Sequence, residues 1–173
     1  MEPQKPTPLK SIAYSFGGIL AIYSMALLVF IYSFEIKQQH WSISLVNILS
    51  YVLIFGYAIQ LFKQKNKGYL SMQETLKVGL AVAVIGGLLS AIYAFFHYSF
   101  VDAGYQTAIL EDSLAQMEKQ NLSEVDKENA LEFTKLLTSP FFMGTITLLQ
   151  NLFFGFIISL VVGLALKKEK PNN

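Results

Sequence analysis

Residues 78–101 of this chain read VGLAVAVIGGLLSAIYAFFHYSFV and contain no Asp, Glu, Lys or Arg. A helix needs roughly 20 apolar residues to cross the hydrocarbon core of a bilayer, because each residue advances it by about 1.5 Å. The backbone must satisfy its own hydrogen bonds in lipid, so such a span is expected to be helical despite its β-branched and aromatic residues. The stretch therefore predicts a transmembrane helix.

Three further uncharged gaps flank this stretch along the chain. They cover residues 12–34, 41–62 and 136–166, and Pro140 divides the last one, so that its apolar part is 141–166. Each gap is long enough to cross a bilayer. The sequence predicts an all-α membrane protein, a single domain over residues 1–173 with four transmembrane helices. The expected spans are about 12–34, 41–62, 76–101 and 141–166.

The composition agrees with a membrane protein and excludes several classes of function. Hydrophobic residues make up 53% of the chain and charged residues 14%, whereas soluble domains carry about 25% charged residues. Cys is absent, which excludes disulfides and zinc–thiolate sites. All thirteen basic residues are Lys, so the bidentate phosphate and base contacts that Arg makes are missing. We expect no nucleic-acid partner.

The lysines are distributed unequally between the two sides of the predicted bundle. One side has nine, in the N-terminal tail (1–10), around the second connection and in the C-terminal tail (167–173), and the other side has four. Excess Lys near helix ends marks the cytoplasmic side. We therefore expect a multi-pass protein of the cytoplasmic (inner) membrane with both termini in the cytoplasm. The first and third connections would then face outward.

The third connection, residues 102–139, is the largest segment outside the predicted spans. It contains eight acidic residues and three lysines, a net charge of −5 within a chain whose total is +1. An unstructured loop of this length is unusual in a compact protein, and the apolar spacing indicates an extracytoplasmic helical hairpin. Glu124, Glu128 and Glu132 share one helical face, which is either a solvated surface or a site for a cation or a basic partner.

Local signals place the two helices of the predicted hairpin. Leu110, Leu114 and Met117 follow the spacing of one helical face, and only Gly104 separates this pattern from the third span, which allows that helix to continue straight out of the bilayer. Ser123 and Asp126 have the form of a capping box for the second helix. Spacing also predicts an apolar face for this second helix. Ser139-Pro140 is expected to form the N-cap and first turn of the fourth span. The predicted face comprises Ala130, Phe133, Leu136 and Leu137.

Small and polar residues recur within the spans. Two stripes of small residues, typical of close helix packing in lipid or of a homo-oligomer seam, are Gly79, Ala83 and Gly87 in the third span and Gly155, Ser159 and Gly163 in the fourth. No acidic or basic residue lies deep in a span, as proton relays and ion pathways usually require. The carboxamides of Asn47, Gln150 and Asn151 are near mid-membrane and fit interhelical hydrogen bonds or a polar conduit.

Residues suited to catalysis or metal binding are few. His40 and His97 fall near the outer boundary, at a depth close to that of Glu35 and Asp102, but they lack the spacing of metal ligands. No nucleophile elbow, phosphate loop or metalloprotease motif is present. We expect no catalytic site, metal or cofactor.

Several stretches resemble a known bacterial membrane family, domain-of-unknown-function 4199. The similar stretches are Gly68-Tyr69-Leu70-Ser71, Glu74 to Leu80, Ile85 to Tyr93, Asn121-Leu122-Ser123-Glu124, Thr138-Ser139-Pro140, Gly155 to Leu160 and Lys167-Lys168. They span nearly the whole chain, although the first two helices are less distinctive. The resemblance implies a four-helix cytoplasmic-membrane protein and brings no established activity.

Three classes of function remain open at this point. The favoured hypothesis is a non-enzymatic scaffold or accessory protein that meets a membrane or extracytoplasmic partner through the acidic hairpin. A small oligomeric transporter or channel would use Asn47, Gln150 and Asn151. A membrane-embedded lipid-modifying enzyme would use His97 and Asp102 as acid–base groups.

Overall fold

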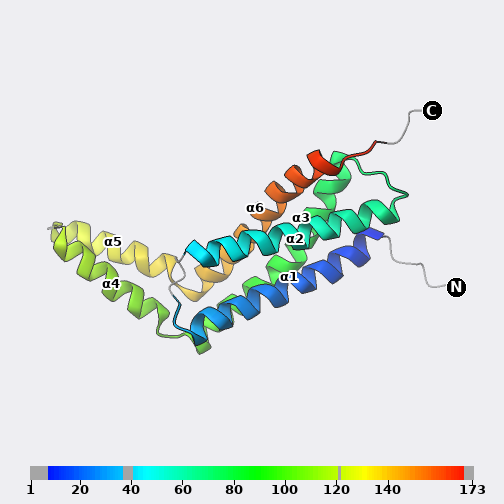
Figure 1. The fold of residues 1–173 in the computed structure, drawn as a ribbon. Helices are drawn as coiled ribbons and strands as arrows, with labels where there is room; N and C mark the ends of the chain where they lie inside the picture. The colour runs from blue at the N-terminus through cyan, green and yellow to red at the C-terminus, as the bar shows by residue number, and fades with distance from the viewer. Residues whose placement is uncertain (1–7, 37–40, 121, 170–173) are drawn as a thin grey trace. The chain divides into compact units, whose positions relative to one another are not determined.

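A computed structural model describes residues 8–36, 41–120 and 122–169 (Figure 1). Most of the predicted N-terminal tail, His40 with the neighbouring Lys37, and the last four residues lie outside this part. In the described residues all regular structure is helical, apart from one isolated β-bridge.

Among the described residues, four helices are long and apolar enough to cross a membrane, as the uncharged gaps predicted. They are α1 (Pro8–Ser33), α2 (Trp41–Lys65), α3 (Met72–Phe96) with the π-helical turn η1 (His97–Val101), and α6 (Pro140–Leu166). The first three helices extend beyond the uncharged gaps and include charged residues at their ends, such as Lys63 and Lys77. Long Lys side chains at a helix end reach the polar interface, so charge does not mark where the helix stops.

The described chain divides into two compact units, residues 1–90 with 148–173, and residues 91–147. The first unit combines α1, α2, most of α3 and most of α6. Its core is aromatic and aliphatic, and α1 packs along α2. The Tyr51 and Phe55 rings meet edge-on with centroids 6.1 Å apart, a favourable geometry for aromatic pairs. The largest fully buried side chains of this core are Phe55, Ile12, Leu20 and Ile59.

The connection between α2 and α3 is held by specific hydrogen bonds. Ser71 and Glu74 form a complete capping box: the Glu74 N–H donates to the Ser71 Oγ (3.2 Å), and the Ser71 N–H donates to a Glu74 carboxylate oxygen (2.8 Å). Leu70 and Lys168 form a two-way antiparallel bridge, with N–O distances of 2.8 and 2.9 Å. The Lys63 ammonium donates to the Leu166 carbonyl oxygen (2.8 Å) at the end of α6, where a cation satisfies an otherwise open acceptor. The start of α3 and the end of α6 are therefore tied together.

The sequence allowed the third span to continue straight out of the bilayer. The second unit shows that it does not. After η1 the Asp102 N–H donates to the His97 carbonyl oxygen, five residues back (2.8 Å), which is the π-helical pattern. The helix ends there, and α4 (Tyr105–Lys119) begins after Gly104.

The segment between the third and fourth spans forms two helices, α4 and α5 (Glu124–Leu137), which lie side by side (Figure 1). The capping residues are as predicted, because the Ser123 Oγ accepts from the Asp126 N–H and the Ser139 Oγ accepts from the Phe142 N–H. The predicted apolar face of α5 is only partly correct. Ala130 and Leu137 are half-buried, but Phe133 and Leu136 are 62% and 59% exposed.

Candidate functional site

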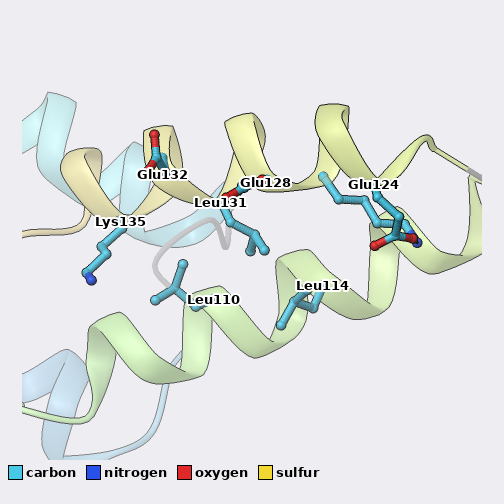
Figure 2. A pocket seen from close by; sticks show the side chains of 8 residues that line it. Leu110, Leu114, Glu124, Glu128, Leu131, Glu132 and Lys135 are labelled. Atoms are coloured by element: carbon cyan, nitrogen blue, oxygen red, sulfur yellow. The ribbon is translucent and has the colours of Figure 1, made fainter.

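A groove of about 550 Å³ runs between α4 and α5 (Figure 2). Leu110 and Leu114 of α4 and Leu131 of α5 form its apolar surface, and in Figure 2 Leu131 points from α5 toward α4. The three acids singled out from the sequence, Glu124, Glu128 and Glu132, all line this groove. Apolar spacing on α4 and acidic spacing on α5 thus meet in one place.

Two lysines, neither of them a predicted site residue, also line the groove. Lys127 forms an ion pair with Glu124, with 2.8 Å between Nζ and Oε1. The hydrogen bond that the Lys127 ammonium donates to the Glu124 carboxylate raises the pKa of Lys127 above its usual value, so this lysine stays charged. Lys135 lies at the other end of the groove, where its carbonyl oxygen accepts a hydrogen bond from the Gln106 side chain (2.8 Å). Glu128 and Glu132 have no ion-pair partner in the described part of the chain.

The three intramembrane carboxamides have three different environments. The Asn47 Oδ1 accepts a hydrogen bond from the Tyr23 hydroxyl (3.0 Å). Asn151 is buried, and its Oδ1 accepts a hydrogen bond from the Tyr51 hydroxyl (3.2 Å). Gln150 is exposed. The two tyrosine partners could not be assigned from the sequence, because the chain has nine tyrosines and nothing in their spacing selects Tyr23 and Tyr51.

The two stripes of small residues meet each other where α3 faces α6. A Cβ placed on Gly79 would collide with the Ser159 side chain, and one on Gly155 would lie 2.7 Å from the Ala83 Cβ. The stripe ends make similar contacts: a Cβ on Gly87 would lie 3.1 Å from the Asn151 Cβ, and one on Gly163 would lie 2.9 Å from the Met72 Sδ. These two helices therefore approach too closely for larger residues.

His97, a candidate acid–base residue, is buried in η1, and its Nδ1 lies 3.4 Å from the Tyr93 hydroxyl. The backbone N–H of the candidate partner Asp102 donates to the His97 carbonyl oxygen, and the Asp102 carboxylate also interacts electrostatically with the imidazole. The described residues contain no group of three or more His, Cys, Asp or Glu side chains arranged to hold a metal ion.

A comparison with protein-family models gives one match, described as a protein of unknown function (DUF4199), over residues 15–168. The chain belongs to the DUF4199 family. No curated protein and no solved structure matches it. The DUF4199 match includes the last three candidate spans, the first span from residue 15 onward, the α4–α5 groove and the contact between Gly79 and Ser159, so these features lie within the family's own region.

Proposed function

We propose that this DUF4199 protein is a non-enzymatic scaffold of the cytoplasmic membrane. It would present α4 and α5 on the extracytoplasmic side of that membrane, as an acidic hairpin that binds a protein partner. The supporting observation is the groove, in which Leu110, Leu114 and Leu131 lie beside three glutamates. A groove with an apolar surface and polar edges is the usual form of a site that takes an amphipathic helix.

The charge of the segment selects the occupant. Residues 102–139 carry a net charge of −5, and Glu128 and Glu132 lack ion-pair partners among the described residues. A partner helix with apolar residues for the three leucines and lysines or arginines for the glutamates would complement both parts. The opposite charges would also speed association and choose among competing partners. The occupant is therefore an amphipathic segment with a basic face.

The surroundings of the other candidate residues support the scaffold over the alternatives. A conduit needs polar side chains along one path. Instead, Asn47 and Asn151 each accept a hydrogen bond from a different tyrosine, and Gln150 lies on an exposed surface. An acid–base site needs side chains that reach a substrate, whereas His97 is only 1% exposed.

Site-specific photocrosslinking in cells tests the proposal. A benzophenone amino acid replaces Leu114, which lines the groove, or Val125, which is exposed on α5 but does not line it. We expect capture of a protein from position 114 and not from position 125. The crosslinked peptide of that protein should be an amphipathic segment with a basic face. A synthetic copy of this segment should bind the purified protein with an affinity that falls as salt rises.

Two matched charge variants separate the groove from bulk charge. The triple variant Glu124→Gln, Glu128→Gln, Glu132→Gln alters the groove. The control variant Glu111→Gln, Asp112→Asn, Glu118→Gln removes the same charge from exposed positions of α4 that do not line it. The first should weaken capture and peptide binding at least tenfold, and the second much less. Equal weakening by both, or equal capture from positions 114 and 125, would sink the proposal.

A further inference from the structure

Gln150 presents an unsatisfied carboxamide on the outer surface of a membrane-spanning helix. It lies near the middle of α6, its side chain is exposed, and it forms no hydrogen bond within the described part of the chain. A glutamine carboxamide has two N–H donors and an oxygen acceptor. The hydrocarbon core offers no water to bond them, so an unpaired group there is costly. This residue needs a partner that the described part of the single chain does not supply.

The residues around Gln150 form an exposed seam along α6. Gln150, Ile157 and Leu164 are spaced by seven residues, and Phe153 and Leu160 form a second series with the same spacing. Phe153, Ile157 and Leu164 are 60%, 38% and 61% exposed, and Leu160 is half-buried. Two series at this interval keep one side of a helix facing a neighbouring helix. Gln150 is thus a polar position within an apolar seam, the arrangement that fixes register in paired helices.

The small-residue face of α6 is not free to form this contact. Gly155 and Ser159 lie against Ala83 and Gly79 of α3 in the same chain. A neighbouring chain must therefore meet α6 on another face, and the face that contains Gln150 is exposed.

We propose that a second copy of this chain covers the seam, so that two α6 helices pack side by side with Gln150 against Gln150. All copies insert with the same orientation, so equivalent residues lie at the same depth. A carboxamide both donates and accepts, so it is complementary to its own copy. The pair is a symmetric dimer about an axis along the membrane normal, in which each chain satisfies the other's polar group.

Association in liposomes tests this dimer directly. The purified full-length protein, labelled with donor or acceptor dye, is diluted over a range of lipid-to-protein ratios, and energy transfer gives the association constant. Gln150→Leu keeps the size and removes the hydrogen bonds. We expect the association constant to fall about tenfold, the change that interhelical hydrogen bonds between polar side chains give in membranes.

The control is Thr145→Val, which removes another exposed polar group of α6. The Thr145 hydroxyl already donates to the Phe141 carbonyl oxygen (2.9 Å), so this variant should leave association unchanged. Far-UV circular dichroism of each variant establishes that the helices are retained. A wild-type protein that stays monomeric at every dilution overturns the dimer. A dimer that Gln150→Leu leaves unchanged overturns the role of Gln150.

Single cysteines locate the contact, because the natural chain has none to interfere. Ile157→Cys is on the seam, Phe156→Cys is exposed on the flank of the same helix, and Leu53→Cys is exposed on α2. We expect Ile157→Cys to form an intermolecular disulfide much faster than the other two. Equal rates at position 157 and either control position would contradict a seam centred on Gln150.

Discussion

The contact between Gly79 and Ser159 can be tested by adding one methyl group. A Cβ on Gly79 would overlap the Ser159 Oγ, and it would lie 2.6 Å from the Ser159 Cβ and 3.2 Å from the Gly155 carbonyl oxygen. Rotating the serine hydroxyl removes only the first overlap. Ser159 is fully buried, so the rest of the side chain has nowhere to move, and α3 and α6 must shift apart.

The expected cost of Gly79→Ala is the difference between two effects. Forcing a methyl group into a filled contact costs about 2–3 kcal/mol, the upper part of the usual range, because backbone and Cβ atoms are involved. Alanine is better than glycine in a helix by about 1 kcal/mol. The free energy of unfolding should therefore fall by about 1–2 kcal/mol. Gly56→Ala in α2 should instead be neutral or stabilising, because its Cβ would meet no atom within 4 Å.

Reversible unfolding by SDS in mixed micelles, followed by circular dichroism, measures both variants. The double variant Gly79→Ala, Ser159→Gly removes the overlap, so the two changes should show a favourable coupling energy of about 1 kcal/mol or more. A Gly79→Ala variant as stable as Gly56→Ala, or the absence of coupling between Ser159→Gly and Gly79→Ala, would contradict a steric contact at this position.

Three further changes follow from the hydrogen bonds and charges described above. Ser71→Ala removes the N-cap of α3 and should cost about 1 kcal/mol in the same titration, whereas Ser71→Asp should cost less; equal losses would contradict the cap. Tyr51→Phe removes the buried hydrogen bond to Asn151 and should also cost about 1 kcal/mol; an unchanged midpoint would contradict it. Burial, and then the Asp102 carboxylate, raises the pKa of Tyr105 above 10.0. The stability that the neutral Tyr105 hydroxyl contributes is complete below its pKa in the unfolded chain, about 10. It is lost as the pH rises through its higher pKa in the folded chain. As the pH rises above about 10, the wild type should therefore lose more stability than Tyr105→Phe, and parallel losses would contradict this.

The spans were predictable because lipid excludes charge, and the helix ends were less so because lysine side chains reach water from inside a helix. α2 continues through Lys65, although the uncharged gap stops at Phe62. The N-caps at Ser123 and Ser139 were predictable because capping depends on residues three apart in the chain. The capping box at Ser71 carries the same signal and could have been found in the same way.

Which face of each span packs was not predictable from hydropathy. In lipid the outer surface of a helix is as apolar as its packed surface, so hydrophobic spacing does not separate the two. Gln150 and Asn151 illustrate this, because neighbouring residues point about 100° apart on a helix, and only the structure gives which one is buried. The exposure of Phe133 and Leu136 has a different cause. Spacing predicted one apolar face for α5, but its contact with α4 selects the side that contains Leu131 and Ala130.

The π-helical turn at His97–Val101 gives the chain a place where its length can change without a change of direction. Such a turn holds one residue more than an α-helical path requires. Deleting one residue from it would let the last turn of the third span close as an α-helix and would keep that span's apolar length nearly unchanged. The residues on either side would keep their helical phase, whereas a deletion inside a regular α-helix rotates everything after it by about 100°, the angle that one residue occupies. A one-residue loss at this turn would thus leave the direction in which α4 departs nearly unchanged.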